Sequence, residues 1–319
     1  MLVARCLASM TTAQLSATWS PPIASEATVP ADALVEPYEF PDTGRGLRCK
    51  RAVAKGEELL AVPLEECWHA ADARKFGKLQ ALLRAVPAIS DLDASILQLL
   101  LAQADPGTVS PLRQAHLKEL PQTYNSTLFW SDKQLSELKG SAWYGLANRF
   151  AEEVSSDWAS LQTLMSSASA SIPEEGEHML MDDFLETNGI TWERYQWAYA
   201  TLKSRAAEAA VDGVAGVRLM APGFDLFNHS DAVQPGTSHR FDADRRELIV
   251  MAHKDYEEGE QAFISYGAAS NGSLLLAGGF VLPSNRFDFV EVCGSCHRKS
   301  SSACSTHGET NAFPAPIRL

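Results

Sequence analysis

The chain has 319 residues, 45% of them apolar and 21% charged, a balance typical of a globular protein of one large or two small domains. The formal net charge of −13 disfavours nonspecific binding to nucleic acid, because a protein that coats DNA or RNA is usually basic. No apolar run approaches the roughly 18 residues of a membrane-spanning helix, so no membrane contact is expected.

The N-terminal segment, residues 1–35, is predicted to be disordered. Residues 1–25 contain no Asp or Glu and are rich in Ala, Ser and Thr, a composition that resembles an organelle transit peptide and also fits an ordinary disordered terminus. The six cysteines do not form an evenly spaced disulfide framework, which favours a reducing compartment. The cytoplasm is therefore the first expectation, and a plastid or mitochondrion is the alternative.

Two segments far apart in the chain share a turn pattern. Residues 52–62, AVAKGEELLAV, and residues 256–265, YEEGEQAFIS, each place a charged residue, Gly and Glu before a run with partial apolar alternation. Gly56 and Gly259 supply the backbone freedom that a tight turn needs, so both segments are predicted to be strand-turn-strand units. A third predicted strand is the segment 247–252, ELIVMA.

A long helical insert, at about residues 70–190, separates these predicted strands. The segment 96–102, ILQLLLA, is apolar enough for a buried helix, with Asp91 or Asp93 as its predicted N-cap. Residues 131–165 are also predicted to be helical. Because the strands and the helices occur in separate runs, the layout predicts an α+β architecture.

The helix predicted to begin after the N-cap Thr191 carries an apolar stripe. Its four members, from Trp192 to Leu202, follow at steps of three, four and three and therefore share one face. A further step of three reaches Arg205. Either this guanidinium meets an anion or carbonyl groups or reaches water, or it is simply a cation that the C-terminal end of the helix dipole favours.

The segment 223–230, GFDLFNHS, combines an apolar run with three polar side chains, those of Asp225, Asn228 and His229. A histidine beside an apolar run is most simply a hydrogen-bonded core residue. Metal binding would need further ligands at suitable spacing, and no HExxH pattern is present, so no metal is expected.

A strand is predicted to end at Tyr266, within the sequence FISYG. The dipeptide Ser270-Asn271 then has the character of a helix cap before the short apolar sequence SLLLA, and Gly278-Gly279 closes that helix before Phe280. Each of these features alone is typical of ordinary packing.

Together, these motifs resemble the SET-domain methyltransferases. The order GRGL, KGE, NHS, GEQAFISYG, SN and GGFV is most similar to the branch with a helical insert, which includes the Rubisco large-subunit lysine methyltransferase and the actin-histidine methyltransferase. The resemblance covers about residues 41–292, and a SET domain is expected over 36–292. It implies a SET-type β fold with a threaded (pseudoknot) C-terminal segment, and S-adenosylmethionine as the methyl donor.

The resemblance also implies roles for individual residues. Tyr266 matches the catalytic tyrosine. Arg205, Asp225 and Tyr266 are expected to contact the substrate. The first loop is expected to meet the cofactor mainly through backbone atoms. The cofactor-binding residues implied in this way are Thr43, Gly44, Arg45, Arg205, Asp225, Asn228, His229, Gly278, Gly279 and Phe280.

The implied reaction is methyl transfer to a lysine side chain of a non-histone protein. Free lysine has a pKa near 10.4, so the site would have to favour the deprotonated amine. Gly278 stands where the Rubisco branch carries Tyr and the actin-histidine branch a small residue, which leaves a histidine acceptor open. A third alternative is a SET-derived binding module that has lost turnover.

The C-terminal segment carries a cysteine motif. In relatives, a helical substrate-binding domain follows the SET core, whereas 39 residues follow Phe280 here, so either that domain is missing or the sequence is a truncated or mis-spliced gene model. Residues 293–319 are predicted to be a disordered tail rich in Cys and Ser. Its sequence CGSCH, followed by Cys304 and His307, leaves three readings open: an unstructured tail, a zinc site or haem attachment.

Overall fold

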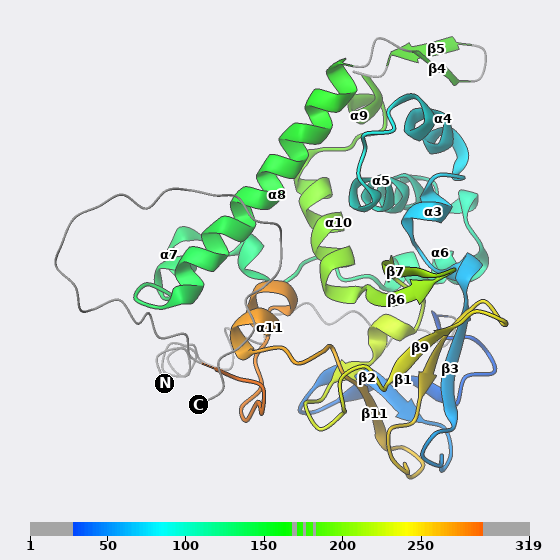
Figure 1. Ribbon diagram of the computed structural model, residues 1–319, viewed down its shortest axis with the longest axis vertical. Helices are drawn as coiled ribbons and strands as arrows, with labels where there is room; N and C mark the ends of the chain where they lie inside the picture. The colour runs from blue at the N-terminus through cyan, green and yellow to red at the C-terminus, as the bar shows by residue number, and fades with distance from the viewer. Residues whose placement is uncertain (1–27, 168–170, 175–176, 181–182, 290–319) are drawn as a thin grey trace.

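The computed structural model describes residues 28–167, 171–174, 177–180 and 183–289. The predicted transit peptide and the cysteine-rich tail both lie outside the described residues. The prediction of disorder over residues 1–35 was wrong for its last part, because Val29, Ala33 and Val35 are buried and Val35 begins strand β1. Within the described part, most helices gather at one end of the molecule and most strands at the other (Figure 1). None of the helices in that part combines the length and the hydropathy that crossing a lipid bilayer demands.

Two small sheets form the β end. The first has the order β1-β2-β11-β8, with antiparallel neighbours except for the parallel pair β11 and β8. The second has the order β3-β10-β9 and is antiparallel. Two hairpins, β4-β5 and β6-β7, complete the strands of the described part. The bounds are β1 Val35–Phe40, β2 Gly44–Cys49, β3 Glu58–Pro63, β4 Ser171–Glu174, β5 Glu177–Leu180, β6 Ala207–Val211, β7 Val214–Leu219, β8 Asn228–His229, β9 His239–Asp242, β10 Glu247–Met251 and β11 Gln261–Ile264.

The two predicted strand-turn-strand units have the expected turns but different partners. Gly56 and Gly259 adopt φ angles of 84° and 80°, which glycine reaches without strain. Neither segment folds back on itself. Val53 and Tyr256 instead form an antiparallel bridge between the two segments, while β3 pairs with β10 and β11 with β2. Apolar alternation indicates that a strand has one buried face, but it does not identify the strand's neighbour.

The helices α3 to α9 fall within the range of about 70–190 where the helical insert was predicted, and α10 follows it. Helix α11 follows β11 in the chain and packs back against helices α8 and α10. The bounds are α3 Ala70–Ala73, α4 Gly77–Ala85, α5 Asp91–Ala104, α6 Pro111–Glu119, α7 Asp132–Ser136, α8 Ala142–Ser167, α9 Phe184–Thr187, α10 Trp192–Arg205 and α11 Asn271–Gly278.

Two predictions for the helices were wrong in detail. The N-cap of α5 is Ser90, whose hydroxyl accepts the backbone N–H of Asp93 at 3.0 Å. The two predicted caps instead occupy the first turn, where acids favour the helix dipole. The predicted helix over residues 131–165 is divided into α7 and α8, because Gly140 adopts a φ of 88° between them.

Helix α10 connects the helical core to the β end. Its predicted N-cap is confirmed, since the Thr191 side chain accepts the N–H of Arg194 at 3.4 Å. Tyr195 is fully buried against α5, and its hydroxyl donates to Asp93 at 2.7 Å. The helix packs on α5 and α8 and ends at Arg205, next to the β strands (Figure 1). This packing places Arg205 where the helical part of the chain meets the β end.

Candidate active site

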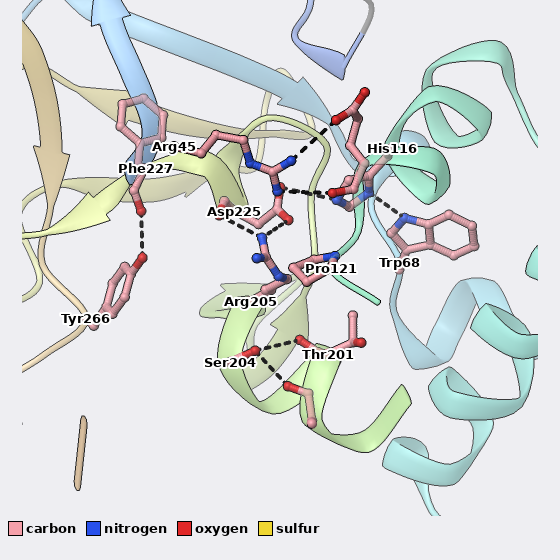
Figure 2. Close-up of polar contacts among 12 residues, drawn as sticks. Arg45, Trp68, His116, Pro121, Thr201, Ser204, Arg205, Asp225, Phe227 and Tyr266 are labelled. Atoms are coloured by element: carbon pink, nitrogen blue, oxygen red, sulfur yellow. Dashed lines mark hydrogen bonds and ion pairs between the residues drawn. The ribbon is translucent and has the colours of Figure 1, made fainter. Parts of the chain in front are cut away.

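The Asn228-His229 pair lies beside the strand that leads to Tyr266. Strands β8 and β11 run parallel, with His229 opposite Ile264. The Tyr266 backbone N–H donates to His229 Nδ1 at 3.1 Å, and the two rings stack with centroids 5.1 Å apart. The Tyr266 hydroxyl donates to the carbonyl oxygen of Phe227 at 2.6 Å (Figure 2). Residues that are distant in sequence therefore converge on the Tyr266 phenol.

Tyr266 has an accessible ring and a buried hydroxyl. The residue is 42% exposed. Burial of the hydroxyl raises the pKa of Tyr266 to about 12, against a smaller opposing effect of the Arg205 charge. The phenol is therefore neutral near pH 7 and acts as a hydrogen-bond donor.

The first loop of the sheet is held by Asn228. Its side-chain Nδ2 donates to the carbonyl oxygen of Arg45 at 3.0 Å. This approach requires Gly46, because a Cβ there would lie 2.8 Å from Asn228 Nδ2 and 2.6 Å from Gln261 Nε2. Thr43 is exposed and donates through its hydroxyl to Gln261 at 2.9 Å, and Gly44 adopts a φ of 66°. Gly46 was part of a recognised motif, but this role was missed.

A buried ion pair joins α10 to the segment before the Asn-His pair. Arg205 Nη1 lies 2.7 Å from Asp225 Oδ2 and 3.2 Å from the Asp225 carbonyl oxygen. The Asp225 side chain is 2% exposed. Of the alternatives that the sequence left open for Arg205, the guanidinium meets an anion. Burial by itself would raise the pKa of Asp225, but His116 and Arg205 outweigh it and hold that pKa well below its usual range.

His116 faces the other oxygen of the same carboxylate. Its Nε2 lies 3.2 Å from Asp225 Oδ1, and its Nδ1 accepts the indole N–H of Trp68 at 3.1 Å (Figure 2). An indole nitrogen can only donate, so His116 Nδ1 is the acceptor of this bond. Nε2 and Oδ1 lie close together, but neither atom makes a hydrogen bond within the described residues.

Helix α6 supplies a second polar contact to the site. Arg45 Nη2 donates to the carbonyl oxygen of Glu119 at 3.0 Å, and Arg45 Nη1 lies 3.3 Å from the Glu119 carboxylate. Burial, followed by the nearby Arg205 charge, lowers the pKa of Arg45. Sequence reasoning missed His116, Glu119 and Trp68, because each is an isolated residue outside any recognised motif.

The turn after α11 closes the site on the side of the insert. Gly279 adopts a φ of 72°, and a Cβ there would lie 2.5 Å from the Asn125 carbonyl carbon. Asn125 Nδ2 donates back to the Gly279 carbonyl oxygen at 3.0 Å. The Phe280 ring lies edge-on to Tyr266, with centroids 6.3 Å apart, and a Cβ at Gly278 would come within 2.7 Å of that ring. Small residues here allow Phe280 to reach the site.

The arrangement suits the orientation of a neutral nucleophile. It offers a neutral phenol donor, a backbone carbonyl next to it and two partly buried guanidinium groups. Throughout the part of the chain that the structure describes, no three His, Cys, Asp or Glu side chains gather in a way that could hold a metal ion.

Comparison with known proteins identifies relatives of this chain. The SET domain family model matches residues 44–267. The chain is 30% identical over 269 residues to an actin-histidine N-methyltransferase of Drosophila melanogaster, covering 79% of this chain and 47% of that protein. It is 26% identical over 259 residues to an actin-histidine N-methyltransferase of Danio rerio, covering 79% and 40%. The chain thus spans about half the length of these relatives or less.

Solved structures share the fold. The SET domain of LSMT bound to lysine and AdoHcy matches with a TM-score of 0.66 at 21% identity, over 80% of this chain and 54% of that chain. Rubisco LSMT bound to AdoMet matches with a TM-score of 0.64 at 21% identity, over 79% and 53%. The fold, α+β with a helical insert, is therefore the one that the motifs predicted. The family model matches residues 44–267, which is more than half of this chain, and the chain therefore belongs to the SET-domain family.

Proposed function

We propose that this protein transfers a methyl group from S-adenosylmethionine to a nitrogen of a protein side chain. The observation that carries the proposal is the Tyr266 hydroxyl, held at 2.6 Å against the Phe227 carbonyl beside Asn228-His229. Support comes from the relatives named as actin-histidine N-methyltransferases and from the structural neighbours bound to AdoMet or AdoHcy.

Unsatisfied polar atoms in the site fit the methyl donor. Arg205 Nε is buried and, within the described residues, makes no hydrogen bond, and the same holds for His229 Nε2. An unpaired buried donor costs about 1–3 kcal/mol, so a ligand with acceptor groups is expected there. The carboxylate of S-adenosylmethionine would satisfy Arg205. The loop Thr43-Gly44-Arg45, the Asn228-His229 backbone and the turn Gly278-Gly279-Phe280 are proposed to hold the rest.

Positioning is the main contribution proposed for this chain. Holding the acceptor nitrogen in line with the donor carbon can by itself supply about 7–11 kcal/mol in favourable cases. The Tyr266 hydroxyl is proposed to orient the nitrogen, and backbone carbonyls such as that of Phe227 would make weak C–H···O contacts with a polarised methyl group.

A histidine acceptor is the favoured form of this proposal. Asp225 is the carboxylate whose charge reaches Tyr266, yet its lowered pKa and its pairing with Arg205 and His116 make it a poor proton acceptor. Imidazole, with a pKa near 6.5, is already mostly neutral at pH 7, whereas lysine at about 10.4 must first lose a proton. The names of the sequence relatives agree with histidine.

Lysine, the acceptor expected from the sequence, is the second candidate. The observation in its favour is that neighbours of the same fold are bound to lysine and to methyllysine. In that case the site would have to lower the lysine pKa by desolvation and by the charge of the sulfonium.

A methylation assay tests the proposal. The protein would be incubated with radiolabelled S-adenosylmethionine and with purified actin, purified Rubisco or cell extract, and labelled proteins would be mapped by mass spectrometry. Label on histidine that disappears with Tyr266→Phe is the expected result. Label on lysine would select the second candidate. Donor binding by calorimetry without transfer to any protein would replace the enzymatic proposal by the binding module.

A further inference from the structure

Tyr124 lies next to Arg205, in the segment that follows helix α6. The guanidinium carbon of Arg205 is 5.9 Å from the centre of the Tyr124 ring. The same ring stacks with that of Phe129, with centroids 6.4 Å apart and an angle of 26° between the planes. Tyr124 therefore borders the arginine that is proposed to bind the methyl donor, although no sequence motif pointed to it.

The residues that follow Tyr124 are fixed to the turn after α11. Asn125 Nδ2 donates to the Gly279 carbonyl oxygen at 3.0 Å, and the Ser126 hydroxyl donates to the Leu276 carbonyl oxygen at 2.7 Å. A Cβ at Gly279 would lie only 2.5 Å from the Asn125 carbonyl carbon, so the two backbones are in close contact. The Tyr124 side chain is thus carried by a segment that the turn closing the site holds in place.

The Tyr124 hydroxyl is buried close to Arg205 and Thr201, yet no hydrogen bond of normal geometry joins it to any residue that the structure describes. Burial raises the pKa of Tyr124, against a smaller opposing effect of the Arg205 charge. The phenol is therefore neutral near pH 7 and can donate its proton to an acceptor. Arg205 Nε is likewise buried without a partner among the described residues. Two neighbouring buried groups in this condition indicate a ligand with acceptor oxygen atoms.

We propose that Tyr124 is a further residue that binds S-adenosylmethionine, through a hydrogen bond from its hydroxyl to the carboxylate of that ligand. A carboxylate has two oxygen atoms, so it can accept from the Arg205 Nε–H and from the Tyr124 O–H at the same time. Hydrogen bonds to an ionised acceptor are also roughly twice as strong as those between neutral groups. This inference rests on the proposed function, since it assumes that Arg205 contacts the carboxylate of the methyl donor.

Stability distinguishes this role from a role in packing. Tyr124→Phe keeps the ring, its stacking on Phe129 and its contact with Arg205, and removes only a buried oxygen atom that lacks a hydrogen bond. Burying an unpaired polar group is unfavourable, so the melting temperature of the ligand-free variant should equal or exceed that of the wild type. A hydroxyl that stabilised the fold would instead lower the melting temperature when removed.

The test combines calorimetry with thermal unfolding and needs no acceptor protein. S-adenosylhomocysteine, which carries the same carboxylate as the methyl donor, serves as the probe. We expect Tyr124→Phe to raise its Kd about tenfold, the loss of one hydrogen bond to a charged group, without lowering the melting temperature of the ligand-free protein. A rise of less than about threefold would overturn the inference, and so would a rise that comes with a lower melting temperature.

Tyr195→Phe is the matched control on α10, the helix that carries Arg205. The Tyr195 hydroxyl is buried and donates to Asp93 at 2.7 Å, so its removal breaks a hydrogen bond that the fold uses. The melting temperature should fall by about 2 °C or more, while the Kd stays within about twofold of the wild type. Equal losses of affinity in the two variants would show that the Kd responds to any disturbance of α10, and would overturn the inference.

The remaining outcomes separate this inference from the proposed function. A wild-type protein that binds no S-adenosylhomocysteine defeats the proposed function. A wild-type protein that binds it, with the affinity retained in Tyr124→Phe, defeats the role of Tyr124 alone. A Tyr124→Phe variant that does not fold would show that the hydroxyl supports the structure, and this too counts against the inference.

Discussion

The Tyr266 hydroxyl donates a 2.6 Å hydrogen bond to the carbonyl oxygen of Phe227, the residue directly before the Asn228-His229 pair. The two residues are 39 positions apart in sequence. Because the parallel strands β8 and β11 bring them together, the contact depends on the whole β end being folded. The Asn-His pair at the end of an apolar segment therefore has a structural reason. Asn228 donates to the first loop, and His229 accepts a hydrogen bond from the Tyr266 backbone N–H.

Replacing Tyr266 by Phe tests the role of the phenol. The variant removes the donor to Phe227 and is expected to lower kcat for protein methylation by about 100-fold, since a small misplacement of the reacting atoms can cost about 10²-fold. The Kd for S-adenosylhomocysteine should change little, because the Tyr266 hydroxyl bonds to the Phe227 carbonyl and is not one of the groups proposed to hold the methyl donor. Initial rates and calorimetry on both proteins provide the check, and a full rate in the variant would contradict the assignment.

Replacing Asp225 by Asn tests the buried ion pair. The substitution leaves the Arg205 charge without its anion in a site where the Asp225 side chain is 2% exposed, so a loss of about 3–5 kcal/mol in the free energy of unfolding is expected. Asp212→Asn is the control, because the pair of Asp212 with Arg246 is 58% and 54% exposed and should contribute about 1 kcal/mol or less. Urea denaturation measures the free energy of unfolding of both variants. Equal losses in the two variants would show that the Asp225 pair contributes no more to stability than the exposed pair.

Replacing Gly279 by Ala tests the close approach of the last turn to the insert. A left-handed conformation costs a residue with a Cβ roughly 1–2 kcal/mol, and the contact of that Cβ with Asn125 adds to it. Gly213→Ala is the matched control, since Gly213 adopts a φ of 81° but a Cβ there meets nothing within 4 Å. Thermal unfolding should show the larger decrease for Gly279→Ala. Similar decreases would mean that the turn has room for a side chain.

Lowering the pH should destabilise the folded chain already at pH values above those at which carboxylates titrate. Burial is the largest cause of a lowered pKa for His69, His229, His239 and His253. As the pH falls below about 6.5, the unfolded chain takes up protons that the folded chain refuses, so stability is complete above that value and is lost below it.

The melting temperature is therefore expected to be lower at pH 5.5 than at pH 7.5, and differential scanning calorimetry at both values measures it. His239→Gln, which removes one titrating ring whose pKa shift comes from burial, should reduce the difference between the two pH values. A difference that is the same in the variant would show that this histidine does not contribute.

Local features of the fold were predictable because their causes lie within a few residues. The cap at Thr191 and the turns at Gly56 and Gly259 depend on side-chain chemistry and backbone freedom at single positions. Strand neighbours were not predictable in the same way. The bridge between Val53 and Tyr256 joins two segments whose patterns are alike, and apolar alternation cannot distinguish such a partner from a hairpin.

The order of motifs along the chain by itself determined the family, and the types of side chain around Tyr266 and Asn228-His229 determined which residues to seek in the site. Only the tertiary structure decided how the charges are shared. Whether Arg205 meets an anion, and whether His116 faces that anion, depends on which distant surfaces meet and lose water. Desolvation strengthens each of these contacts, and it arises only when the insert and the β end are packed together.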